Sequence, residues 1–160
     1  MFREMRRKGQ QLSAEECIEI LNRGTSGVLA LEGDDGYPYA VPLSYVYEDG
    51  RLYFHCATSG HKLDAIRQNP KASFCVVDQD QVVPKEYTSY FKSVIAFGTM
   101  GILEDTAKKR AAIEKLALKY AACDSAENRR RAIDDYWDTL CMLEMRIEHL
   151  TGKCARELKA

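Results

Sequence analysis

Short segments of alternating apolar and polar residues, separated by turn residues at hairpin spacing, restrict the possible folds of this chain more than any other feature. The pattern predicts strands over residues 28–31, 37–47, 51–57, 71–78 and 89–98, the last continuing toward 103. Two of the turns, Asp34-Asp35-Gly36 and Glu48-Asp49-Gly50, end in a glycine that can adopt positive φ. Few helical segments lie between these strands. The sequence therefore predicts one mainly β domain, an antiparallel barrel or sandwich.

The clearest strand pattern covers residues 37–47, where six alternating positions from Tyr37 to Tyr47 fall on one face. Pro42 lies inside this segment, and proline cannot donate a hydrogen bond to a neighbouring strand. We therefore expect an edge strand, a bulge, or backbone that faces something other than a strand. A flat ring bound to backbone groups of residues 41–44 and a water-facing edge are both compatible with this pattern.

Four further segments complete the predicted secondary structure. Ser13 and Glu16 form a capping-box pattern before a helix that ends at Gly24. Apolar residues at helical spacing predict helices over residues 107–120 and 126–140, and we interpret both apolar stripes, including Tyr120 and Tyr136, as core. Alternation over residues 141–149 predicts a closing strand. Polar loops are expected over residues 79–85 and in the tail after 150.

Residues 51–69 combine a strand, a polar turn and a short helix that stops before Pro70. The turn, residues 58–62, lies where backbone N–H groups lack helical partners and the helix dipole adds partial positive charge. With two hydroxyl side chains, Gly60 and Lys62, it is a candidate phosphate cradle. It has neither the Walker A nor the GxGxxG spacing. An ordinary strand–glycine–helix junction with a solvated lysine is the alternative.

Composition excludes several classes of protein. The net charge of −1, from 23 basic and 24 acidic residues, gives no reason to expect nucleic acid or an anionic membrane as a partner. No apolar run is long enough to span a bilayer, and the charged N-terminal decapeptide does not resemble a signal peptide. The six cysteines form no CxxC pair and the three histidines are scattered, so we expect reduced thiols, a cytoplasmic location and no metal site.

Several segments, in this order and spacing, resemble the flavin-binding proteins related to pyridoxamine 5′-phosphate oxidase, and within them the 5-nitroimidazole-resistance (Nim-type) nitroreductase branch. The similarity extends from about residue 5 to residue 153 and is carried by residues 5–8, 36–43, 53–57, 60–66, 93–98 and 151–153. It implies a six-stranded antiparallel split β-barrel spanning residues 1–160 as a single FMN-binding domain. It also implies a homodimer with FMN in each cleft between subunits.

The resemblance also implies roles for individual residues. Val41, Pro42, Leu43 and Ser44 would face the isoalloxazine ring, and His55, Cys56 and Ala57 would line the flavin and ribityl side. Ser59, Gly60, His61 and Lys62 would hold the phosphate, and Ser93 would reach the flavin from its strand. His55 is the candidate proton donor, because imidazole exchanges protons near neutral pH. A histidine bonded to a core carbonyl is the alternative for that residue.

The expected function is an FMN-dependent oxidoreductase that takes electrons from a nicotinamide and reduces a small nitroaromatic or nitroimidazole-type acceptor. The substrate-binding arginine motif of the true oxidase is not found, and an arginine–lysine pair of its phosphate turn is replaced by His61-Lys62. These differences argue against pyridoxamine phosphate oxidation. Other members of this wider fold bind F420 or haem. A non-catalytic flavin or haem carrier, and an interaction domain with an empty barrel, are therefore the alternatives.

Overall fold

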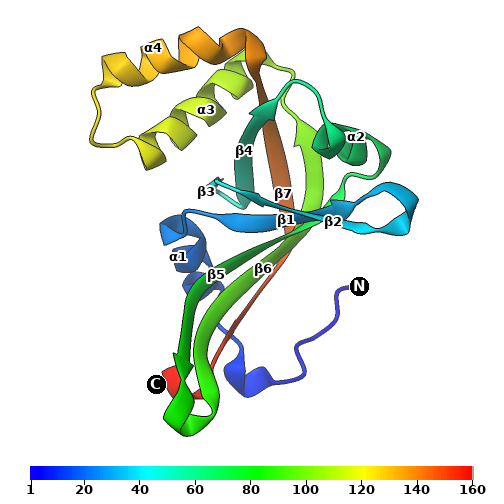
Figure 1. The fold of residues 1–160 in the computed structure, drawn as a ribbon, viewed down its shortest axis with the longest axis vertical. Coiled ribbons are helices and arrows are strands. Elements are labelled where there is room, and N and C mark those ends of the chain that lie inside the picture. Colours follow the sequence, from blue (N-terminus) through cyan, green and yellow to red (C-terminus); the bar gives the residue numbers. More distant parts are fainter. Residues whose placement is uncertain (160) are drawn as a thin grey trace.

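The computed structural model describes residues 1–159, and a single antiparallel sheet dominates it. The sheet has the strand order β2-β1-β5-β6-β7-β4-β3 (Figure 1). Its strands are β1 (Gly27–Glu32), β2 (Pro38–Leu43), β3 (Val46–Glu48), β4 (Arg51–Ala57), β5 (Lys71–Val83), β6 (Thr88–Ile102) and β7 (Leu140–Cys154). The predicted mainly β, antiparallel architecture is confirmed.

The sheet has seven strands and does not close, so the expected count of six was wrong. The predicted strand over residues 37–47 is interrupted at Ser44 and Tyr45, which separate β2 from β3. These two strands lie at opposite ends of the strand order although they are consecutive in the chain. The reason is Tyr45, whose fully buried side chain packs edge-on against Phe74, with 4.9 Å between ring centroids. Of the three possibilities left open for Pro42, the structure shows an edge strand, because β2 pairs only with β1.

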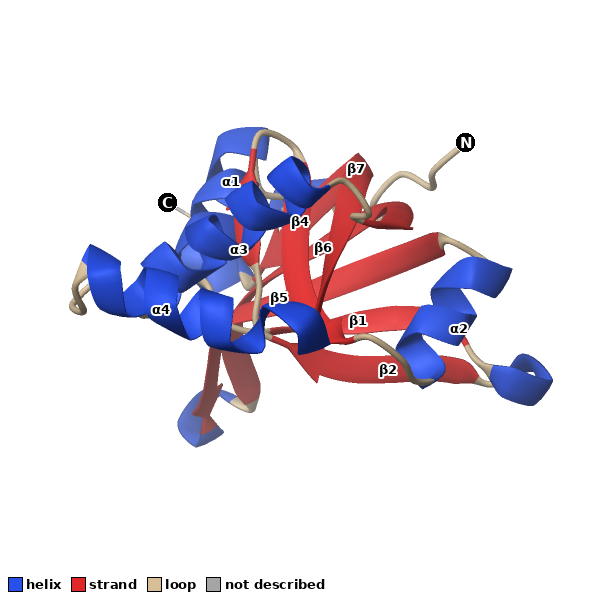
Figure 2. Cartoon of the chain, turned by 90° about the horizontal axis from the view of Figure 1, so that it is seen from above, coloured by secondary structure: helices blue, strands red, loops and turns tan. Residues whose placement is uncertain are grey.

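Four helices accompany the sheet: α1 (Ala14–Arg23), α2 (His61–Gln68), α3 (Thr106–Tyr120) and α4 (Ala126–Tyr136). The capping box at the start of α1 is present, with Ser13 Oγ accepting from the Glu16 N–H at 3.2 Å. Figures 1 and 2 show α3 and α4 as a helical hairpin at one end of the molecule, with α2 on the other side of β4. None of these helices is both long enough and apolar enough to cross a bilayer.

Buried side chains form two clusters. The first fills the inside of the sheet and includes Leu29, Phe54, Phe74 and Val94, with α1 packed against it. The second lies between the helical hairpin and the outer face of β4 and β7, and includes Ile113, Leu116, Ile133, Leu140 and Met142. The predicted apolar stripes are therefore largely core. The two tyrosines predicted as core are exceptions: Tyr136 is 68% exposed at the end of α4, and Tyr120 is 39% exposed at the end of α3.

Strand β5 is longer than predicted and forms a projecting arm with β6, which has about its predicted extent (Figure 1). The predicted loop over residues 79–85 was wrong, because residues 79–83 pair with residues 88–92 after a bulge that follows Val77. Polar residues are compatible with a strand here because the arm has no core to cover, and Val82 and Tyr87 are 68% and 99% exposed. Similarly, β7 extends to Cys154 and includes part of the predicted tail.

Tyr120, at the end of α3, fixes the break between β2 and β3. Its hydroxyl accepts from the Tyr45 N–H at 2.9 Å and lies 3.0 Å from the Tyr45 carbonyl oxygen. It also contacts the Thr25 carbonyl oxygen. The neighbouring Lys119 donates to the Gly24 carbonyl at 2.5 Å and lies over the Tyr45 ring. Two adjacent residues of α3 therefore satisfy backbone groups that no strand pairs.

Tyr120→Phe should lower the free energy of unfolding by about 1–3 kcal/mol, because it leaves the Tyr45 N–H without its partner. Urea denaturation measures this change, with Tyr136→Phe as the control because the Tyr136 side chain is exposed. Equal stability of Tyr120→Phe and the wild type would show that the hydroxyl does not support the strand break.

Candidate functional site

The opening of the sheet leaves two free strand edges. β2 pairs only on the side of β1, and β3 pairs with β4 only as far as Tyr53, so residues 54–57 of β4 are unpaired on that side. The predicted ring-facing residues 41–44 belong to the first edge and its continuation, and His55, Cys56 and Ala57 belong to the second. Backbone groups of both edges are therefore available to a ligand.

The turn after β4 has the features expected of an anion cradle. Gly60 occupies the N-cap position of α2 with φ of 130°, a conformation that other residues adopt only with strain. A Cβ at this position would meet no atom within 4 Å, so the requirement for glycine comes from the backbone and not from crowding. No side chain caps α2. The first N–H groups of the helix therefore remain available to a bound anion.

A cavity of about 220 Å³ lies against this turn, and we call it the turn pocket. It is lined by Tyr39, Cys56, Ala57, Ser59, Gly60, His61, Lys62 and Leu63. The structure thus brings together six of the predicted site residues, from the end of β4 and the start of α2. Lys62 supplies the positive charge, and Ser59 supplies a hydroxyl donor.

Tyr39 belongs to the same pocket, although the sequence reasoning did not include it. Its ring stacks on that of His61, with 4.2 Å between centroids and 24° between planes. His61 Nε2 also lies 3.5 Å from a carboxylate oxygen of Asp34. The only signal in the sequence was the position of Tyr39 on one face of an alternating strand. That face could not be matched to α2 without the tertiary structure.

Cys56 forms an uncharged wall of the turn pocket. Its register partner on β7 is Cys141, and both thiols are free and half-buried. Burial raises the pKa of Cys56 to about 11, the neighbouring Cys141 adds to the rise, and Lys62 opposes it. Because burial disfavours the thiolate, this side chain stays protonated near neutral pH. Cys56 therefore leaves the charge of Lys62 unneutralised.

A second cavity of about 620 Å³ adjoins the turn pocket and shares Cys56 and Ala57 with it. It lies between the helical hairpin and the end of β4. The exposed side chain of His55 lines this second cavity and not the turn pocket. His55 is therefore placed beside the predicted phosphate site but faces a different space. The alternative of a histidine held inside the core is excluded by its exposure.

Five predicted residues lie outside both cavities. Val41, Pro42, Leu43 and Ser44 stay on the β2 edge and line neither space. Ser93 lies opposite Lys153 on β7, whereas Cys56 lies opposite Cys141. The intervening part of β7 spans about 40 Å at roughly 3.3 Å per residue. Ser93 therefore does not join the turn pocket of its own chain.

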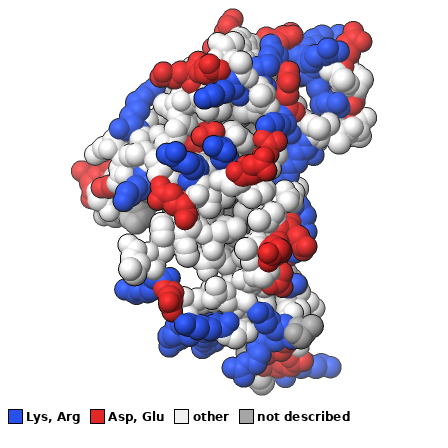
Figure 3. Space-filling model, turned by 180° about the vertical axis from the view of Figure 1, so that it is seen from behind, with Lys and Arg blue, Asp and Glu red and all other residues white. Residues whose placement is uncertain are grey.

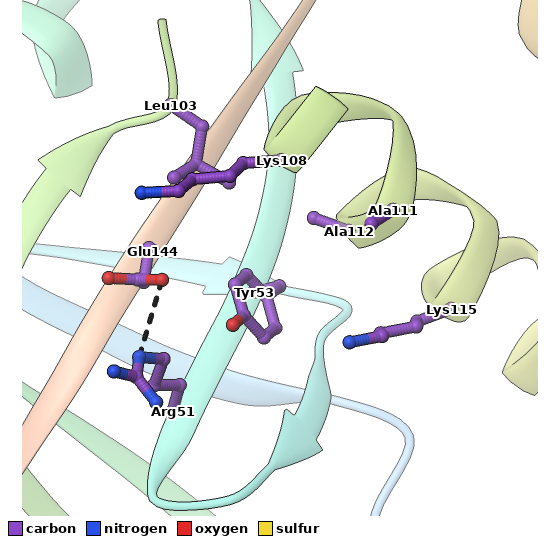
Figure 4. Close-up of a pocket in the computed structure, with 8 residues that line it drawn as sticks. All are labelled: Arg51, Tyr53, Leu103, Lys108, Ala111, Ala112, Lys115 and Glu144. Carbon is purple, nitrogen blue, oxygen red and sulfur yellow. Dashed lines mark ion pairs between the residues drawn. The ribbon is translucent and has the colours of Figure 1, made fainter. Parts of the chain in front are cut away.

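A third cavity, of about 290 Å³, lies where α3 begins over the outer face of β4 and β7 (Figure 4). Arg51, Lys108 and Lys115 make it basic, but Arg51 pairs with Glu144 at 3.5 Å and Lys115 pairs with Glu48. It contains none of the predicted site residues. Among residues 1–159, no three His, Cys, Asp or Glu side chains are arranged as ligands for a metal ion.

Comparison with known proteins identifies the family. The family model described as pyridoxamine 5′-phosphate oxidase matches residues 13–154. The chain belongs to this family. The match covers every α-helix and strand described above, including both free edges and the turn pocket. The predicted split-barrel relationship is therefore confirmed. No relative is found among curated protein sequences.

Solved structures with the same fold come from several bacteria. A candidate 5-nitroimidazole antibiotic resistance protein from Bacteroides thetaiotaomicron has a TM-score of 0.76 and 18% identity, covering 90% of this chain and 86% of that one. A FAD-binding protein from Mesorhizobium loti has a TM-score of 0.63 and 27% identity, covering 91% and 97%. A FAD- and haem-binding protein from Mycobacterium smegmatis has a TM-score of 0.69 and 21% identity, covering 91% and 73%.

Proposed function

We propose that this protein is an FMN-dependent oxidoreductase that uses a reduced nicotinamide to reduce a small nitroaromatic or nitroimidazole-type acceptor. The observation that carries the proposal is the meeting of the turn pocket with the second cavity at Cys56 and Ala57, with His55 in the second. An anion site, a strand edge and a proton donor are thereby contiguous. The fold shared with the Bacteroides protein supports the choice of acceptor.

FMN fits the residues of the turn pocket by their chemistry. The uncapped start of α2, the Ser59 hydroxyl and the Lys62 ammonium together provide donors and positive charge for a phosphate. The pocket volume of about 220 Å³ suits the phosphate end of the cofactor, and the free edges of β2 and β4 offer backbone groups to its rings. The flavins named for the Mesorhizobium and Mycobacterium proteins support a flavin here.

The protein's own residues would position the reactants and supply a proton. A flavin held there would supply two-electron transfer from the nicotinamide to the acceptor. In one such cycle a nitro group, a hydride and one proton give a nitroso group and water. His55 is placed to deliver that proton and recover it from solvent, because its side chain is exposed in the second cavity. Two-electron delivery avoids release of a nitro radical.

A flavin or haem carrier without turnover is the second candidate. It is favoured by the fold shared with a protein that binds both groups. The absorbance spectrum of the purified protein separates flavin, deazaflavin and haem. Nicotinamide oxidation in the presence of a nitroimidazole then separates a reductase from a carrier.

The six free cysteines fit the proposed cytoplasmic location, where thiols stay reduced.

A homodimer is part of the proposal, because the middle of one sheet face carries uncharged side chains, of which Val28 and Val77 are exposed. Alternation places the inner side chains of β1, β5 and β6 in the core, so the intervening residues face outward. In the middle of these strands the outward residues are Val28, Ala30, Ser73, Cys75, Val77, Ser93 and Ile95, which carry no charge, whereas Glu32 and Lys71 lie at the ends of the same face and Phe97 contacts Phe2. Figure 3 shows a broad uncharged band across the face opposite to that of Figure 1. Ser93 lies on this face opposite Val77, so a second copy covering the face would contact it.

Lys62→Ala should weaken FMN binding by about 1.5–3 kcal/mol, the value for a hydrogen bond to a charged group. Titration of flavin fluorescence measures the dissociation constant. Lys85→Ala, on the tip of the β5–β6 arm, is the matched control and should bind as the wild type does. An unchanged FMN affinity in Lys62→Ala would remove this residue from the phosphate site.

His55→Ala should keep its FMN affinity but reduce the nitro acceptor about a hundredfold more slowly, as expected for the loss of a general acid. Stopped-flow measurement of flavin reoxidation isolates this step, and its pH dependence should disappear in the variant. His149→Ala is the control, since His149 stacks on Phe2 with 4.6 Å between centroids. Wild-type reoxidation by His55→Ala would show that another group supplies the proton.

Val77→Lys should convert the dimer to a monomer, because it places a charge in the outward sheet face where Val77 is 61% exposed. Sedimentation equilibrium reports the mass. Leu118→Lys, which adds the same charge on the exposed side of α3, should leave the dimer intact. A wild-type protein that is monomeric at micromolar concentration would contradict the proposed assembly.

A further inference from the structure

The cavity beneath the helical hairpin, called here the hairpin groove, has a lining suited to a flat ring. Its volume of about 620 Å³ lies in the range of small-molecule sites. Its lining comes from the end of β4, from α3 and α4, and from the start of β7. Ile113, Ile133 and Leu140 are buried and form an apolar wall.

Alanines create the space. Ala117 and Ala121 lie four residues apart on one side of α3 and its C-cap, and Ala132 faces the same groove from α4. A larger side chain at any of these positions would occupy the groove itself. The Tyr136 ring stands exposed in the lining and provides an aromatic surface for stacking. The shape and the apolar wall favour a planar aromatic occupant.

The charged side chains that line the groove sum to zero, so the groove offers no net charge to attract an ionic ligand. Arg129 and Asp124 are its two charged residues. An Arg129 guanidinium nitrogen donates to the Ala121 carbonyl at 3.0 Å and also to that of Asp124. The Asp124 carboxylate accepts from the Asn128 amide at 2.8 Å and from the Ser125 N–H at 2.7 Å. Both charges are engaged within the hairpin, so the groove suits an uncharged ligand and not a phosphate-bearing one.

The position of the groove links this ligand to the reaction. It shares Cys56 and Ala57 with the turn pocket, and His55 lies in its lining. We infer that the hairpin groove binds the electron acceptor, as an uncharged single-ring heteroaromatic compound held between the alanines of α3 and α4 and presented to His55. This inference rests on the proposed function, since it assigns that reaction's acceptor to a site.

The inference is tested with a substitution that fills the groove without disturbing the core. Ala132 is exposed on α4, so Ala132→Phe should fold normally while its ring occupies the groove. Ala107→Phe, on the exposed first turn of α3 and outside the groove lining, is the matched control. The probe is 2-methyl-5-nitroimidazole. Its binding is followed by quenching of Trp137, the only tryptophan, which packs against the apolar cluster that contains Ile133 and Leu140.

For Ala132→Phe we expect the dissociation constant of the probe to rise at least tenfold while that of FMN changes less than twofold. Ala107→Phe should change neither. Unchanged probe affinity in Ala132→Phe, or no probe binding by a wild-type protein that binds FMN, would overturn the inference. A parallel loss of FMN affinity would also overturn it, because the groove would then belong to the cofactor.

The two proposals can fail separately. If the wild type binds no flavin, the proposed function fails. The probe titration still decides the assignment of the groove, because the lining residues come from the protein alone. If FMN binds and is reduced by a nicotinamide but Ala132→Phe binds the probe normally, the proposed cofactor stands and only the acceptor site is wrong.

Discussion

The burial of Tyr45 is the constraint on which the opening of the sheet depends. Its ring lies fully inside the core against Phe74, and its hydroxyl donates to the Leu21 carbonyl at 2.8 Å. Its backbone groups are bound by Tyr120 and not by a neighbouring strand. A residue anchored in this way cannot continue the ladder of β2. The chain therefore crosses to the opposite end of the sheet, and two strand edges remain free.

The free edges and the helical hairpin together produce the site. α3 contributes Tyr120 to the strand break, and the same helix provides one wall of the hairpin groove. The turn pocket is formed on the other side of β4, where α2 begins without a side-chain cap. One strand end, residues 55–57, thus separates a small polar pocket from a larger apolar groove. This arrangement is the basis for our proposal that a phosphate-bearing cofactor and an uncharged acceptor meet at this strand end.

Much of the fold could be predicted from the sequence because local chemistry determined it. The capping box of Ser13 and Glu16, the apolar stripes of α3 and α4, and the turn around Gly60 each involve residues within a few positions of one another. The β5 side of the arm was missed because the polar residues there resemble a loop. Their strand conformation comes from pairing with residues 88–92, which no local pattern reveals.

For the site, the sequence by itself determined the residues of the turn, because a strand end, a glycine of positive φ and a helix start are all encoded within residues 51–69. Only the tertiary structure decided which distant residues join them. Tyr39 reaches His61, the helical hairpin reaches His55, and Ser93 lies at the far end of β7 from the turn. The physical reason is that strand order and helix packing minimise exposed apolar area over the whole chain. The spacing of residues within a single segment does not determine that arrangement.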